Sequence, residues 1–209
     1  MGHPVIATPH IDALARQGVV FPRGYVPTAL CRPSLATIVT GLHAHQHGIV
    51  GNDPFVPFEG SWTEYWADPR YRRLNARVQA RLDAVPTLPR LLAKRGYRSF
   101  QSGKWWEGSH RRGGFTSGMT HGDPDRGGRH GDEGLTIGRA GLQPIFDFLD
   151  DGGDEPFFVW YAPFLPHTPH DPPARLLEKY AAPGRPLELS RYYAMSEWFD
   201  ETVGALLQY

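Results

Sequence analysis

The chain has 209 residues, a formal net charge of +0 and 40% hydrophobic residues. A balanced charge gives no general attraction to nucleic acid or to an anionic membrane surface, so anion binding would depend on local geometry. No apolar run approaches the ~18 residues of a membrane span, and the single cysteine excludes an intrachain disulfide. The length predicts roughly one or two domains with a sizeable core.

The N-terminal stretch predicts a short helix followed by a turn into the core. Thr8 is a favourable N-cap residue, Pro9 suits the first turn and Gly18 can end the helix. The apolar residues expected to face inward are Ile11, Leu14 and Ala15. Val19-Val20-Phe21 then predicts a short strand or a turn that enters the core.

A second helix is predicted beside the only cysteine, in the stretch Cys31-Arg32-Pro33-Ser34-Leu35-Ala36-Thr37-Ile38-Val39-Thr40-Gly41. Pro33 suits a first turn, and Gly41 can end the helix with positive φ. The spacing of Leu35, Ile38 and Val39 is that of a packed helical face. Cys31 then precedes a helix N-terminus, where backbone N–H groups and the dipole favour sulfate or phosphate. Taken alone, a single cysteine is more often a small buried hydrophobic residue.

The middle of the chain predicts two helices, a strand and a long loop. Apolar spacing and capping residues predict helices over residues 74–82 and 87–96. Residues 97–101 are expected to form a strand, which places Lys104 at the carboxyl end where open α/β sheets bind ligands. Residues 108–141 contain eleven glycines and predict a long loop.

Two groups of histidines raise the question of a metal site. His43, His45 and His47 alternate along the chain, but no carboxylate or thiol at ligand spacing completes a set. We therefore expect a polar loop at the rim of the site. The second group lies in the long loop and comprises His110, His121 and His130. These three are expected to be exposed loop residues rather than ligands.

The last third alternates between helices and one strand. Residues 142–149 predict a helix, and the continuous apolar run 156–161 predicts a strand covered on both faces. His167 follows the carboxyl end of that strand. Two more helices are predicted over residues 176–180 and 191–208, and the final one is expected to bury Tyr192, Met195, Phe199, Val203 and Leu206. This alternation predicts a layered α/β fold.

Four stretches resemble motifs of the sulfatase family, and they occur in the family's order. They are Thr8-Pro9-His10-Ile11-Asp12-Ala13-Leu14-Ala15, the Cys31-x-Pro33-Ser34 stretch with its helix, Gly103-Lys104-Trp105-Trp106, and Pro166-His167-Thr168-Pro169. The resemblance covers the chain from Thr8 to the last helix. It implies the alkaline-phosphatase-like version of the α/β fold, with a mixed or mostly parallel sheet flanked by helices.

The resemblance implies hydrolysis of sulfate esters. In this family the cysteine matched by Cys31 is oxidised to formylglycine by a formylglycine-generating enzyme, and its hydrated aldehyde is the nucleophile beside a bound Ca²⁺. Lys104 matches a lysine that contacts the sulfate, and His167 matches a histidine near the leaving group. Two positions depart from the pattern. Leu35 stands where the family has arginine and Trp106 where it has histidine, which removes a charge and a proton carrier.

The family also binds its Ca²⁺ through an Asp-Asp pair on an N-terminal strand and a later Asp-Asn pair, and this chain matches neither. We therefore expect residues 1–209 to be part of one sulfatase catalytic domain, lacking its N-terminal strand and C-terminal portion, and inactive alone. A signal peptide preceding this stretch would direct the protein to the periplasm or outside the cell.

The expected substrate is a sulfated small molecule or a sulfated glycan. Two alternatives stay open. One is a degenerate sulfatase-like protein that binds sulfated glycans without turnover. The other is a phosphate or phosphonate ester hydrolase of the same superfamily, and the preferred ester would distinguish it.

Overall fold

The structure, a computed structural model, describes residues 2–209 and divides into two compact units. The sheet unit comprises residues 25–135 and 147–162. The helical unit comprises the chain up to Gly24 together with residues 136–146 and 163–209. The expectation of a single catalytic domain stays a prediction.

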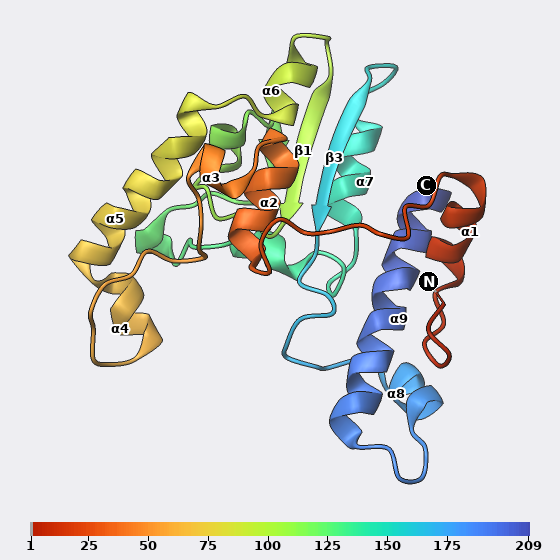
Figure 1. Ribbon diagram of the computed structural model, residues 1–209. Coiled ribbons are helices and arrows are strands. Elements are labelled where there is room, and N and C mark those ends of the chain that lie inside the picture. The colour runs from red at the N-terminus through yellow and green to blue at the C-terminus, as the bar shows by residue number, and fades with distance from the viewer. Residues whose placement is uncertain (1) are drawn as a thin grey trace. The chain divides into compact units, whose positions relative to one another are not determined.

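The sheet unit begins with a run of helices, and its three strands follow with short 3-10 helices between them (Figure 1). Its elements are α2 Cys31–Thr40, α3 Ala44–His47, α4 Trp62–Ala67, α5 Pro69–Gln79, η1 Ala80–Ala84, α6 Leu88–Ala93, β1 Arg98–Gly103, η2 His110–Gly113, β2 Ser117–Gly118, η3 Pro124–Arg126 and β3 Phe157–Ala162. The helical unit contains α1 Pro9–Gln17, α8 Ala174–Tyr180 and α9 Leu187–Gln208. The 3-10 helix η4 Asp132–Thr136 and the helix α7 Gln143–Asp150 have residues in both units.

β1 is the central strand of a three-stranded parallel sheet with the order β2-β1-β3. Arg98 pairs with Phe157 and Gly103 with Ala162, so β1 and β3 end at the same edge of the sheet (Figure 1). Every residue of β1 after Arg98 is buried. The predicted strand and the position of Lys104 directly after it are therefore confirmed.

The prediction that the apolar run at 156–161 is covered on both faces is wrong. Trp160 is the buried residue of β3, and Phe157 is 53% exposed. β3 lies at an edge of the sheet formed by the described residues, where fewer side chains cover a strand than at the centre. A continuous apolar run does not distinguish these two positions.

Aromatic side chains form the core of the sheet unit. The ring of Trp105 lies edge-on to Phe115 and to Trp160, with centroids 5.4 and 6.1 Å apart. Val39 from α2 and Leu82 from η1 complete this buried cluster. Burial of each such side chain stabilises the fold by about 1.5–3 kcal/mol. The cluster packs α2 against the residues that flank the carboxyl end of β1.

In the helical unit, α1 and α8 pack against α9. The final helix begins at Leu187, four residues before the predicted start. Its expected apolar face is partly wrong, because Met195 is buried but Tyr192 is 44% exposed. The buried face instead includes the polar residues Ser190, Glu197, Asp200 and Thr202. Two of these bind neighbouring helices, since Glu197 accepts the hydroxyl of Tyr180, and Asp200 accepts backbone N–H groups of α1.

Several apolar side chains expected to face inward are exposed. Leu14 is 48% exposed, Ile38 is 60% exposed, and Val19 and Phe21 are more than 80% exposed. The segment 19–21 is neither strand nor core. Apolar spacing identifies a helix correctly, but burial also needs a facing layer. No layer among residues 2–209 covers these side chains.

Within residues 2–209, none of the helices combines the length and the apolar character that crossing a membrane requires.

Asp200 is predicted to be the main polar link between α9 and α1. Its carboxylate is buried and accepts the N–H groups of His10 and Ile11 at 3.1 and 2.8 Å. Asp200→Ala leaves two first-turn donors without this partner and should lower the free energy of unfolding by about 2–3 kcal/mol. Urea unfolding measures the loss. Glu201→Ala is the matched control, because it removes an exposed ion pair with Arg175 worth about 0–1 kcal/mol. Equal losses would contradict the assignment.

Candidate functional site

Cys31 lies in the first turn of α2, one residue inside the helix rather than just before it. Leu30 is the N-cap residue, with extended backbone. Gly41 ends the helix in the left-handed conformation, with φ of 70°, as predicted. Cys31 is a free thiol of intermediate exposure. The side chain at this position therefore lies among the N–H groups at the positive end of a helix dipole.

Lys104 reaches Cys31 from the carboxyl end of β1. Gly103 has φ of +79°, which favours glycine, and the N–H of Lys104 donates to the carbonyl of Ala162 at 2.7 Å. The Lys104 ammonium donates to the thiol Sγ of Cys31 at 4.0 Å. Burial lowers the pKa of Lys104 below its ordinary value. Two predicted site residues, 73 positions apart in sequence, are thus brought together.

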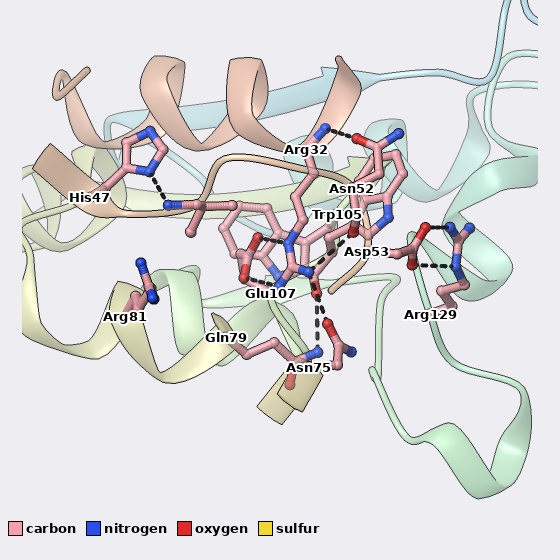
Figure 2. Close-up of polar contacts among 12 residues, drawn as sticks. Arg32, His47, Asn52, Asp53, Asn75, Gln79, Arg81, Trp105, Glu107 and Arg129 are labelled. Carbon is pink, nitrogen blue, oxygen red and sulfur yellow. Dashed lines mark hydrogen bonds and ion pairs between the residues drawn. The ribbon is translucent and has the colours of Figure 1, made fainter. Parts of the chain in front are cut away.

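Arg32, the residue after the cysteine, anchors the first turn of α2. Arg32 is 1% exposed, and its Nε and Nη2 atoms donate to the two carboxylate oxygens of Glu107 at 2.7 and 2.8 Å. Its Nη1 atom donates to the side chain of Asn75 at 2.8 Å, and its backbone N–H donates to the side chain of Asn52 at 2.9 Å. Figure 2 shows the bonds to Glu107 and Asn75 meeting at the guanidinium, and the bond to the Asn52 side chain at the backbone N–H. The network fixes the first turn of α2 against the segment that follows Lys104.

His130 is a site residue that sequence analysis did not identify. Its ring lies 5.1 Å from that of Trp106, and its carbonyl accepts the N–H of Trp105 at 3.0 Å. Burial lowers the pKa of His130 to about 4, and the charges of Arg129 and Lys104 add to this effect. His130 is half-buried, so its expected exposure is wrong. A neutral imidazole therefore lies near Lys104, beside the tryptophan that stands where the family has histidine.

The other loop histidines are also half-buried rather than exposed. The ring Nδ1 of His110 donates to the carbonyl of Thr120 at 3.0 Å. His121 lies 3.5 Å from Asp132 and 3.6 Å from Glu133. However, its Nδ1 accepts the N–H of Asp123, so this atom already serves the loop's own structure.

His47 is buried in α3 rather than lying in a polar loop at the rim of the site, so that expectation is wrong for this residue. Its Nδ1 accepts the N–H of Ile49 at 3.0 Å (the dashed line at His47 in Figure 2), and its Nε2 lies 3.1 Å from the hydroxyl of Thr37. Both ring nitrogens therefore have partners within the fold. His43 and His45 stack with centroids 5.8 Å apart.

His167 belongs to the helical unit. Its ring stacks on Phe164 at 4.3 Å, and its carbonyl accepts a bond from Arg139 at 2.9 Å. Its role toward a substrate bound at Cys31 stays a prediction.

The residues described around Cys31 do not fit a calcium ion. Calcium takes about 6–8 oxygen ligands. Glu107 is engaged by Arg32, and Asp53 is engaged by Arg129. In the described part of the chain, the group with metal-binding geometry is the separate one formed by His121, Asp132 and Glu133.

The sheet unit thus holds a small set of polar side chains at a helix N-terminus and the carboxyl edge of a parallel sheet, where α/β enzymes bind anionic substrates. The family model for sulfatases matches residues 1–209, so the chain belongs to the sulfatase family. Its α/β fold is accordingly the alkaline-phosphatase-like fold of sulfatases.

Individual relatives agree with this family. Human N-sulphoglucosamine sulphohydrolase is 32% identical over 78% of this chain and 27% of its own length. The ulvan-active sulfatase of Formosa agariphila is 24% identical over 99% of this chain and 43% of its own length. The chain therefore spans less than half the length of these curated relatives.

Solved structures share the fold. The structure of Ps i-CgsB with k-i-k-neocarrahexaose has a TM-score of 0.68 at 21% identity, covering 99% of this chain and 50% of that one. The structure of BT4656 with D-glucosamine-2-N,6-O-disulfate has a TM-score of 0.59 at 23% identity, covering 88% of this chain and 35% of that one.

Removal of one partner of the Arg32–Glu107 pair should be strongly destabilising. Arg32→Met or Glu107→Gln leaves the other group buried without its partner, at a cost of about 3–5 kcal/mol in free energy of unfolding. The double variant should cost less than the sum of the two single variants. Denaturant unfolding of all four proteins measures the coupling. Arg70→Met, which breaks an exposed pair with Asp68, should cost about 0–1 kcal/mol. Additive single losses would rule out a coupled pair.

His130 should make folding stability sensitive to acid. An unfolded histidine titrates near pH 6.5, whereas the folded-state pKa of His130 is about 4. The unfolded chain therefore binds a proton that the folded chain does not, and stability falls as pH drops from about 6.5 toward about 4. NMR titration of the His130 ring gives the pKa directly. His130→Gln should flatten the stability profile more than His45→Gln, an exposed control. A His130 pKa near 6.5 would contradict the prediction.

Proposed function

We propose that the whole protein hydrolyses sulfate esters at the position of Cys31. The observation that carries this proposal is the approach of Lys104 to Cys31, at 4.0 Å, at the N-terminus of α2. A helix N-terminus and a lysine side chain together favour a tetrahedral anion at this point. Membership of the sulfatase family supports sulfate as that anion.

Lys104 is proposed to bind the non-bridging oxygens of the sulfate group. Burial disfavours its charged form, and an arriving sulfate restores that form because opposite charges attract strongly in a partly desolvated site. The same contact stabilises charge in the transition state. Lys104 therefore contributes to binding and to the chemical step.

Cys31 is proposed to act after oxidation to formylglycine by a formylglycine-generating enzyme. The modified residue supplies a hydrated aldehyde, whose oxygen is the nucleophile toward sulfur. Leu35, which stands in place of the family's arginine, packs against the apolar core of the sheet unit. Arg32 does not replace that arginine, because its guanidinium is held by Glu107.

His167 is proposed as the proton donor to the leaving alcohol, from its match to the family motif. No step is assigned to calcium, since the residues around Cys31 do not form its site. The proposed substrate is a sulfated glycan or a smaller sulfate ester. Relatives include an enzyme named for sulphoglucosamine and one named for ulvan.

Binding of sulfated glycans without turnover is a second candidate function. Trp106 favours it, because a buried tryptophan, 5% exposed, stands close to the half-buried His130 where a protonatable group would be needed for turnover. Trp106 supplies no proton carrier at a position where the family has histidine. A further alternative is hydrolysis of a phosphate or phosphonate ester. The ester that the protein hydrolyses best distinguishes it from sulfate ester hydrolysis.

Coexpression with a formylglycine-generating enzyme should convert Cys31 to an aldehyde. Peptide mass spectrometry should find the thiol sulfur replaced by a carbonyl oxygen, and a hydrazide probe should label the wild type but not Cys31→Ala. Pro33 and Ser34, two residues of the recognised motif, are in place. A spectrum that contains only the unmodified thiol would remove the formylglycine mechanism for this protein.

Loss of His167 should affect poor leaving groups most, because a good leaving group needs little protonation. His167→Ala should reduce kcat/KM on an alkyl or sugar sulfate by about 100-fold or more, the usual contribution of general acid catalysis. The loss on an activated aryl sulfate should be much smaller. Equal losses on both substrates would reject the proton-donor role.

A further inference from the structure

The loop that carries His130 is built directly on the carboxyl end of β1. The carbonyl of His130 accepts the N–H of Trp105 at 3.0 Å. The next residue, Gly131, lies so close to Gly103 that a Cβ at position 131 would be 2.7 Å from the Gly103 carbonyl oxygen. Its φ of +146° also favours glycine. The loop backbone therefore lies against the residues on both sides of Lys104.

The ring of His130 belongs to the same cluster as two of the predicted site residues. It lies 5.1 Å from the ring of Trp106. Lys104 is close enough for its charge to add to the effect of burial on the pKa of His130. The ammonium of Lys104 in turn donates to Cys31 at 4.0 Å. Three separate segments of the sheet unit thus bring a thiol, an ammonium and a half-buried imidazole together.

Arg129 determines which ring nitrogen of His130 carries the proton. The Nη1 atom of Arg129 lies 3.2 Å from the Nδ1 atom of His130. Because a guanidinium has N–H donors and no acceptor, Nδ1 accepts this bond. In a neutral imidazole the proton is then on Nε2. The Nε2 atom of His130 is therefore a hydrogen-bond donor.

Arg129 is itself held in place by several contacts. Its Nε atom donates to the Asp53 carboxylate at 3.2 Å, and its Nη2 atom donates to the other oxygen of that carboxylate (Figure 2). Its backbone N–H donates to Asp132 at 3.1 Å, and its guanidinium lies 4.4 Å from the ring centroid of Trp66. The tautomer of His130 therefore follows from a fixed guanidinium rather than from a mobile one.

The cluster offers hydrogen-bond donors to a ligand. Two carboxylates near it, those of Asp53 and Glu107, are each engaged by an arginine. A sulfate ester has only acceptor oxygens, so it matches the ammonium of Lys104 and the Nε2–H group of His130. A phosphate ester that retains a proton carries an O–H group, which also needs an acceptor. Donors alone therefore favour the ester that has no O–H group.

We propose that His130 is a substrate-binding residue whose Nε2–H group donates to a non-bridging oxygen of the sulfate held by Lys104, and that these two donors select an ester without an O–H group. This inference rests on the proposed function and identifies a specificity-determining residue of that same site. Lys104 supplies charge. His130 supplies direction, because a hydrogen bond from a ring held by Arg129 is sensitive to the position of the acceptor.

The first test observes His130 in the whole protein by NMR, with ¹⁵N-labelled histidine and inorganic sulfate as the probe. At neutral pH the two ring nitrogen shifts should identify the tautomer protonated on Nε2. Saturation with sulfate should move the Nε2 resonance. His47 is the internal control, because both its ring nitrogens already have partners within the fold. A proton on Nδ1, or an Nε2 resonance that does not respond to sulfate, would overturn the proposal.

The second test separates the donor from the shape of the ring by calorimetric titration with sulfate. His130→Phe, which has a ring but no donor, should raise the Kd for sulfate about tenfold or more, as expected for loss of a hydrogen bond to a charged group. His130→Gln keeps an N–H donor and should recover binding to within about threefold of the wild type. His45→Phe, an exposed control, should change the Kd less than about twofold. Equal weakening by Phe and Gln at position 130 would refute the donor role.

The selection of an ester without an O–H group is tested with inorganic phosphate in mildly acidic solution, where phosphate retains a proton and sulfate has none. The wild type should bind sulfate at least about tenfold more tightly than phosphate. Equal affinities would contradict the selection. The proposed hydrolysis is judged separately, by turnover of an aryl sulfate. Turnover with an unchanged sulfate Kd in His130→Phe would refute the role of His130 alone. A response of His130 to sulfate without turnover would refute the hydrolysis alone.

Discussion

The buried ion pair between Arg32 and Glu107 is the interaction on which the candidate site depends. It joins the helix that carries Cys31 to the segment that follows Lys104, and both side chains are almost completely buried. Two opposite charges in such a place are tolerated because two parallel hydrogen bonds and two asparagines satisfy the guanidinium and its neighbouring backbone. The ion pair thereby fixes the distance between the Cys31 thiol and the Lys104 ammonium.

The position of Lys104 could be predicted from sequence because it depends on local information. A strand pattern at residues 97–101 and the general position of sites in α/β sheets were sufficient. Gly41 was predictable for the same reason, since a helix end needs a residue that tolerates positive φ. Arg32 was not predictable, because its partner Glu107 is 75 residues away and a single sequence does not reveal such pairs.

Burial was the least predictable property. The apolar spacing in α9 led to an expected apolar face that includes the exposed Tyr192, whereas the polar residues Asp200 and Glu197 are buried because they bind α1 and α8. The expected exposure of His130 was also wrong. Its glycine-rich loop has no periodic pattern, so only the fold reveals that the ring lies against Trp106. Polar residues are buried where they form hydrogen bonds with a neighbouring element, and the sequence alone does not reveal which element that is.

The most direct test of the central claim compares two esters with the same aryl leaving group, one a sulfate and one a phosphate. The whole protein, coexpressed with a formylglycine-generating enzyme, should hydrolyse the sulfate with the higher kcat/KM. Cys31→Ala should reduce that value by about 1,000-fold or more, as expected for loss of a nucleophile. Preference for the phosphate, no turnover of either ester, or unchanged activity in Cys31→Ala would contradict the account.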